Sequence, residues 1–217
     1  MECSSPTRGR VLSLVAATAA AAGSHLVVWY GVRSTWPPPP QLSAVSWSYW
    51  TDLWMLAYAL LLALPAPRRS GLVIGRIREN ARGVALVCGV PLLLTAIVYP
   101  LLPTRPFAGA SSSMWTISPA AQDLVFFGFV YRVLDGPWKG RVVARLPVEW
   151  PLLLTALTFA AWHVPNFSAM PAGYVLFQLV YVFAGACVAG LARQWTGSLL
   201  YGWALHTAAN AIAWAAS

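Results

Sequence analysis

Long apolar segments separated by short polar loops dominate this sequence. Seven such stretches can be marked, at about 11–31, 46–65, 83–103, 117–134, 150–166, 172–192 and 197–216. Only 9% of the 217 residues are charged, whereas a soluble domain of this size has about 25% charged residues. An α-helix of about 20 apolar residues spans the hydrocarbon core of a bilayer. The pattern therefore predicts an all-α, polytopic transmembrane helical bundle with about seven spans, folded as a single membrane domain over residues 1–217.

The first apolar stretch follows Arg8 and Arg10, as the apolar part of a signal peptide does. Its apolar character continues through Tyr30, which is too far for a typical signal peptide. We therefore expect a retained helix rather than a cleaved one.

The basic residues fall mostly in alternate loops. If the N terminus is cytoplasmic, twelve of the fourteen Lys and Arg residues lie on the inner side, and only Arg33 and Arg105 lie on the outer side. Cytoplasmic loops of membrane proteins carry such an excess. This predicts a multi-pass cell-membrane protein with its N terminus in the cytoplasm and its C terminus outside. The same bias accounts for the net charge of +8, so we expect no nucleic-acid partner.

Two histidines, His163 and His206, lie inside apolar stretches. Each has a partner four residues away, Phe159 and Asn210 respectively, and positions i and i+4 share one face of a helix. Ionisable groups inside a bilayer are costly and usually functional. With the N terminus inside, both histidines and Asp123 fall at compatible depths in the outer half of the membrane. We therefore predict one shared polar layer, with Asp123 as its only carboxylate.

Each of these residues also has a structural interpretation when taken alone. A single His or Asn in a membrane helix often hydrogen-bonds a neighbouring helix. An Asp near a helix start stabilises the positive end of the helix dipole. Further along, Gly185 with Ala189, and Ala186 with Gly190, have the small-xxx-small spacing that lets two membrane helices approach closely, and we interpret this pair of motifs as structural.

The two histidine motifs resemble those of the CPBP family of intramembrane proteases, which includes the CAAX prenyl endopeptidases and bacteriocin-processing relatives. The family pattern is Glu-Glu-xxx-Arg, then Phe-xxx-His, then His-xxx-Asn. The pair Phe159 and His163 matches the second motif, and the pair His206 and Asn210 matches the third. The resemblance covers roughly residues 117–214, which we expect to form a CPBP-like core.

The first motif departs from the family pattern. Gln122 and Asp123 occupy the positions of the two Glu residues, and Phe127 occupies the position of the Arg. The resemblance implies that the leading acid activates water, while the His and Asn residues bind a metal or stabilise an oxyanion. A Gln cannot serve as that acid, because a carboxamide does not accept a proton as a general base.

Two mechanisms follow from this substitution. In the first, Zn²⁺ is held by His163, His206 and Asp123, since a catalytic zinc takes about three protein ligands and a water. In the second, no metal is needed: Asp123 activates water, and His163, His206 and Asn210 stabilise the oxyanion. The sequence leaves both open.

We therefore predict a catalytic set of Gln122, Asp123, His163, His206 and Asn210. The leading hypothesis is an intramembrane endopeptidase, of the metallo- or glutamate-like type, that cleaves membrane-associated proteins or peptides in the lipid bilayer. One alternative is a catalytically inactive relative that binds partners or acts in regulation or immunity. Another is a transporter or structural bundle with a chance motif match. Nothing in the sequence demands a prenyl group on the substrate.

Overall fold

The computed structural model describes residues 6–31, 47–101 and 112–216. Every regular element in these ranges is helical, which confirms the predicted all-α bundle. The elements that build it are α1 (Pro6–His25) with η1 (Leu26–Gly31), α3 (Trp47–Ala63), α4 (Ile77–Val98), α5 (Ile117–Asp123) with η5 (Leu124–Val130) and α6 (Tyr131–Leu134), α7 (Trp150–Ala161), α8 (Ala172–Thr196) and α9 (Leu200–Ala215). Short 3₁₀ turns η3 (Tyr99–Leu101), η4 (Ser112–Trp115) and η6 (Val164–Ser168) adjoin them.

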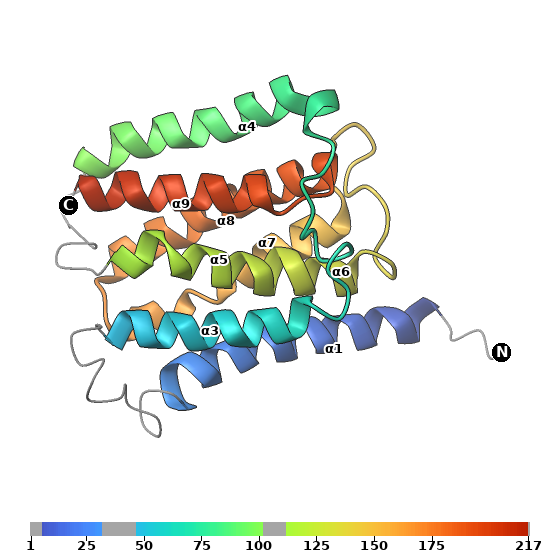
Figure 1. Ribbon diagram of the computed structural model, residues 1–217, viewed down its shortest axis with the longest axis horizontal. Coiled ribbons are helices and arrows are strands. Elements are labelled where there is room, and N and C mark those ends of the chain that lie inside the picture. The colour runs from blue at the N-terminus through green and yellow to red at the C-terminus, as the bar shows by residue number, and fades with distance from the viewer. Residues whose placement is uncertain (1–5, 32–46, 102–111, 217) are drawn as a thin grey trace.

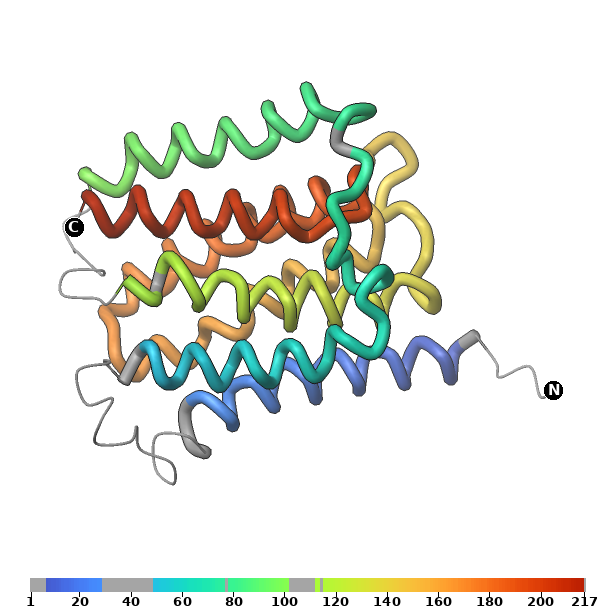
Figure 2. Tube along the Cα trace, viewed as in Figure 1, coloured from blue at the N-terminus to red at the C-terminus, as the bar shows by residue number. Residues whose placement is uncertain are grey.

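The long helices lie side by side and alternate in direction, so that the two termini are at opposite ends of the bundle (Figure 1). The tube in Figure 2 shows the same path without the ribbon. The end that carries the start of α1 also carries the segments 64–76, 135–149 and 197–199. We call it the basic end, because the twelve basic residues expected on one side of the membrane belong to these segments or to the helix ends beside them. Arg33 and Arg105 lie outside the described residues.

The outer surface of the bundle is apolar, as a lipid-facing surface must be. Leu86 and Leu93 of α4 are 68% and 63% exposed. Within the described ranges, three helical stretches are long and apolar enough to span a bilayer: Thr7–Val28, Arg78–Leu101 and Ala172–Thr196. The other helices are shorter, but they pack between these three. The chain is therefore a helical membrane protein.

The central core is formed where the helix that begins with α5 meets its neighbours. Its η5 part turns through wider i→i+5 hydrogen bonds, such as the one from the Tyr131 amide to the Phe126 carbonyl. Phe126 and Phe127 are fully or almost fully buried there. The Phe126 ring packs against that of Phe159 from α7, with centroids 4.9 Å apart, and Met55 of α3 belongs to the same cluster. This apolar layer fixes α3, α5 and α7 relative to one another.

Arginines tie the loops of the basic end to the helices. Arg193, only 5% exposed, donates hydrogen bonds to the backbone carbonyls of Ser70 and Arg69, both at 2.8 Å. Arg132 donates to the Ser70 hydroxyl at 2.9 Å and to the Leu62 carbonyl at 3.1 Å. Buried carbonyls need such donors, so these contacts hold the 64–76 segment against α6 and α8.

Small residues of α8 permit its closest helix contacts. A Cβ atom at Gly190 would lie 2.8 Å from Leu152 Cγ of α7, and one at Gly202 of α9 would lie 3.0 Å from Ala189 Cβ. A Cβ atom at Gly185 would meet nothing within 4 Å among the described residues. The structure therefore gives Gly190 and Ala189 the packing role predicted for the small-xxx-small motifs, and it gives Gly185 none.

Candidate active site

A cavity of about 470 Å³ lies between the helices, toward the end of the bundle opposite the basic end. Most of its wall is apolar. Its polar or ionisable lining includes Asp52 from α3, Gln122 and Asp123 from α5, His163 after α7, and His206 and Asn210 from α9. The structure thus brings all five predicted catalytic residues to one cavity. Their catalytic roles remain predictions.

Asp123 occupies the last α-helical position of α5, where the helix changes to the wider turns of η5. Such π-type turns are frequent at functional sites. Asp123 is 1% exposed and Gln122 is 8% exposed. A buried carboxylate is costly unless it is paired, so the partners of Asp123 decide what it can do.

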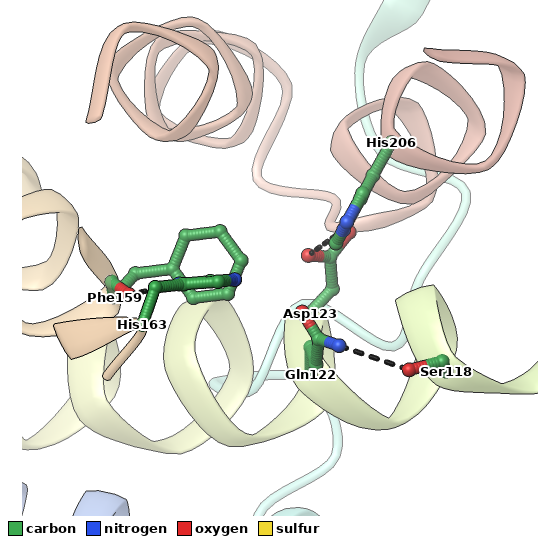
Figure 3. A network of polar contacts seen from close by, with 6 residues as sticks. All are labelled: Ser118, Gln122, Asp123, Phe159, His163 and His206. Atoms are coloured by element: carbon green, nitrogen blue, oxygen red, sulfur yellow. Dashed lines mark hydrogen bonds and ion pairs between the residues drawn. The ribbon is translucent and has the colours of Figure 1, made fainter. Parts of the chain in front are cut away.

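His206 of α9 is the partner of Asp123. Its Nδ1 atom lies 3.1 Å from Asp123 Oδ1 (Figure 3). Because a carboxylate only accepts hydrogen bonds, the Nδ1–H group donates, and the second nitrogen, Nε2, is left for other groups. Asp123 Oδ2 is buried without a hydrogen-bond partner among the described residues. One carboxylate oxygen is therefore fixed, and the other is available to a water or a ligand.

His163 is oriented by its own helix. Its Nδ1 atom lies 2.9 Å from the carbonyl oxygen of Phe159, one turn earlier, so Nδ1 carries the hydrogen and Nε2 is left for the cavity. The Phe159 ring stands at nearly right angles to both imidazoles, with centroids 5.1 Å from His163 and 5.8 Å from His206. The Phe159 ring thus packs against both histidines.

Asp52 is a site residue that sequence reasoning missed. It lies on α3, is 8% exposed, and lines the same cavity as Asp123. The hydroxyls of Ser113 and Ser118 lie near its carboxylate, while its Oδ2 atom has no hydrogen-bond partner among the described residues. The expectation that Asp123 is the only carboxylate in this layer is therefore wrong. The signal was present, because Asp52 is an acid inside the predicted span 46–65.

His25, the remaining histidine, supports the site from α1. Its Nε2 atom lies 2.7 Å from the backbone carbonyl oxygen of Trp162, and its ring stacks on the Trp162 ring with centroids 4.4 Å apart. The Trp162 indole in turn donates to the Ser24 hydroxyl at 3.0 Å. The end of α1 therefore holds the residue that immediately precedes His163. Sequence reasoning gave α1 no part in the site.

The predicted zinc ligands do not form a ready-made metal site. Asp123 and His206 meet, but within the described ranges no three side chains of His, Cys, Asp or Glu are grouped so that they could hold a metal ion. His163 remains apart from the pair, with the Phe159 ring in contact with both histidines. The described residues therefore show no ready-made set of three ligands, and the zinc site stays a prediction.

The fold and cavity together define a helical membrane protein with a buried carboxylate–imidazole centre. The family model for the type II CAAX prenyl endopeptidase Rce1-like family matches residues 104–212, about half of the chain. The chain belongs to this family, in agreement with the resemblance found in its motifs. Neither a curated protein nor a solved structure gave a match to the chain.

Proposed function

We propose that this protein is an intramembrane endopeptidase that hydrolyses a peptide bond of a membrane-associated protein or peptide. The observation that carries the proposal is the Asp123–His206 pair, held at 3.1 Å in a buried cavity. An imidazole that orients a buried carboxylate, or is oriented by one, is a common arrangement for proton transfer in hydrolysis. Membership of a family of type II CAAX prenyl endopeptidases supports the same reaction class.

The hydrolytic steps need only protein groups and water. His206 holds Oδ1 of Asp123, so Oδ2 is the atom that takes a proton from the attacking water. The water oxygen bonds to the carbonyl carbon of the scissile peptide, and the negative charge moves to the carbonyl oxygen. The Asn210 carboxamide supplies an N–H donor for this oxyanion. The proton then passes from Asp123 to the leaving nitrogen, the C–N bond breaks, and a carboxylic acid and an amine result.

His163 completes this scheme through its free ring nitrogen. Because Nδ1–H is engaged by the Phe159 carbonyl, only Nε2 faces the reacting groups. As a neutral ring it accepts a hydrogen bond from water or from a substrate amide. A ring held by a backbone contact keeps one orientation through the reaction, which favours catalysis.

Binding without cleavage is the second candidate function. It is favoured by Gln122, which stands where the family pattern has its leading Glu, and by the buried Phe127, which stands where the pattern has Arg. In that case the same cavity would hold a segment of a membrane partner without hydrolysing it. The two functions share a binding site and differ in whether Asp123 moves a proton.

The membrane orientation is part of the proposal. The basic end faces the cytoplasm of the cell, and the cavity opens toward the outer half of the membrane. The support is the concentration of described basic residues at one end of the bundle, together with the tendency of such residues to stay on the cytoplasmic side.

Cleavage by the purified protein in lipid nanodiscs tests the proposal. Membrane-anchored reporter peptides are incubated with the parent and with His163→Ala and His206→Ala, and new peptide termini are detected by mass spectrometry. We expect cleavage by the parent and at least about a hundredfold loss in each variant. Metal content of the active preparation separates the zinc mechanism from the metal-free one. Binding of the reporters with no new termini would support the non-cleaving function instead.

A further inference from the structure

A pair of carboxamides stands in the mostly apolar wall of the cavity, just after His163 in the chain. Asn166 belongs to η6, the short turn that follows α7, and Gln178 belongs to α8. The Nδ2 atom of Asn166 donates a hydrogen bond to Oε1 of Gln178 at 2.9 Å. Both residues are half-buried and line the cavity that holds Asp123 and His206. The pair therefore belongs to the wall of the proposed active site, although no step of the hydrolysis uses it.

One hydrogen bond leaves half of this pair unused. Two carboxamides bring two acceptor oxygens and two NH₂ groups, and a single N–H···O contact joins one of each. Among the described residues, the Asn166 side-chain oxygen and the Gln178 NH₂ group have no hydrogen-bond partner. If both carboxamides are turned over, one of them still offers an oxygen and the other an NH₂ group. The pair thus presents one acceptor and one donor in either arrangement.

The backbone fixes Asn166 close to His163. His163 precedes η6 as its N-cap residue, and the Asn166 amide donates to the His163 carbonyl oxygen at 3.0 Å. Side chains three residues apart lie above one another in a 3₁₀ turn, at a rise of about 2.0 Å per residue. The two side chains are therefore offset by about 6 Å, which corresponds to about two residues of extended chain at about 3.3 Å each.

An acceptor beside a donor is what one residue of a β-strand offers to the strand next to it. In an antiparallel pair, two facing residues exchange both of their N–H···O bonds. A helical segment would have no use for such a partner, because its peptide groups are already paired within the helix. An unwound segment in a membrane cavity does need one, since unpaired peptide groups away from water are costly.

We propose that Asn166 and Gln178 bind the backbone of an extended substrate segment. Oδ1 of Asn166 accepts a hydrogen bond from the N–H group of one substrate residue, and Nε2 of Gln178 donates to the C=O group of the same residue. That residue lies about two positions from the scissile bond. The inference rests on the proposed function and specifies its substrate: an unwound membrane segment that is recognised through its main chain. The two carboxamides bind the substrate and transfer no proton.

Replacing one substrate amide by an ester tests this contact directly. An ester has an oxygen in place of the N–H group, so it removes one donor and adds no bulk. At the position that pairs with Asn166, the ester should lower kcat/KM about tenfold, mainly through KM because the contact holds substrate and transition state alike. At most other positions the ester should have little effect.

Asn166→Leu should abolish the dependence on that ester. Leu is similar in size to Asn but accepts no hydrogen bond, so the amide and ester reporters should be cleaved by this variant within about twofold of each other. A purely structural effect of the substitution would lower the cleavage of both reporters by the same factor and keep their ratio. Gln178→Met breaks the pair from the other side and replaces Asn166→Leu if that variant does not fold.

The reporter is an apolar peptide without Asn or Gln, joined to a single transmembrane helix, so that only its backbone amides can pair with the two carboxamides. A series with one ester at each position except the scissile bond is incubated with the parent and variants in nanodiscs, with thermal unfolding measured on each protein. The same series is titrated onto Asp123→Asn, with and without Asn166→Leu, to measure binding without turnover. Asn80→Leu is the matched control, because Asn80 is a half-buried asparagine at the basic end that donates to the Trp195 carbonyl at 3.0 Å. It should keep the parental dependence on the ester.

An ester-sensitive position within about three residues of the scissile bond, lost in Asn166→Leu and kept in Asn80→Leu, supports the inference. If the parent cleaves and no such position exists, or if Asn166→Leu keeps the sensitivity, the inference fails and the proposed function stands. If nothing is cleaved but binding to Asp123→Asn shows the same dependence on Asn166, the proposed function fails and backbone binding stands. Neither cleavage nor binding would overturn both.

Discussion

Asp123→Asn should lower kcat strongly while it changes the free energy of unfolding only slightly. The Asn side chain keeps a carbonyl oxygen in place of Oδ1, so it still accepts the hydrogen bond from His206 Nδ1. The atom that changes is Oδ2, which has no hydrogen-bond partner in the described part of the chain. The variant therefore loses a proton acceptor without losing a contact.

The expected magnitudes differ for the two properties. A hydrogen bond to a charged group contributes about 1.5–3 kcal/mol and a neutral one about 0.5–1.5 kcal/mol, so the free energy of unfolding should fall by about 1 kcal/mol. Loss of a general base costs about 10²–10⁴ in rate. At 1.36 kcal/mol for each factor of ten, this is about 2.7–5.4 kcal/mol of activation free energy. The activation free energy of the reaction should therefore change several times more than the free energy of unfolding.

The assay compares kcat on a membrane-anchored reporter with thermal unfolding of the same nanodisc preparation. Asp135→Asn is the matched control for activity, because Asp135 is exposed in the loop after α6, at the basic end, and its loss should leave kcat unchanged. Turnover by Asp123→Asn within about threefold of the parent would refute the general-base role. A loss of activity that only follows a loss of folded protein would refute the separation of the two effects.

Two further predictions concern packing and topology. Gly190→Ala should destabilise the protein by about 1–3 kcal/mol, because its Cβ would lie 2.8 Å from Leu152 Cγ; Gly185→Ala on the same helix has open space and should be neutral or stabilising by up to about 1 kcal/mol in thermal unfolding. With the native cysteines replaced by Ala, Ser168→Cys in the exposed turn between α7 and α8 should react with a membrane-impermeant thiol reagent added outside cells, while Lys139→Cys at the basic end should react only after permeabilisation. The opposite labelling pattern would invert the topology.

Most of the helices and several site residues could be predicted because the requirements for insertion into a membrane are visible in the sequence. Each apolar stretch had to be long and nearly uncharged, so the ionisable residues inside it stood out. The pairs Phe159–His163 and His206–Asn210 were visible because their spacing of four residues places both members on one helix face. A search for every ionisable residue inside an apolar stretch would also have selected Asp52 and His25. Neither lay in a recognised motif, so neither was selected.

Contacts between helices could not be predicted in this way. Nothing in the sequence around Asp52 tells that it lines the same cavity as Asp123, because the two residues lie on different helices, far apart in the chain. The packing of the Phe159 ring against both His163 and His206 likewise depends on how α7 packs against α9. The predicted zinc site depended on this packing, and the described residues do not converge into such a site.

The sequence by itself determined that the chain forms a helical bundle in a membrane, with most of its basic residues at one end and polar groups inside several helices. It could do so because hydropathy, charge and a spacing of four residues are local properties, set by the bilayer and by the pitch of a helix. The tertiary structure alone decided which polar groups from different helices come together: Asp123 meets His206, and Asp52 lines the same cavity. The direction of a hydrogen bond depends on a partner contributed by another part of the chain, and only packing brings that partner within reach.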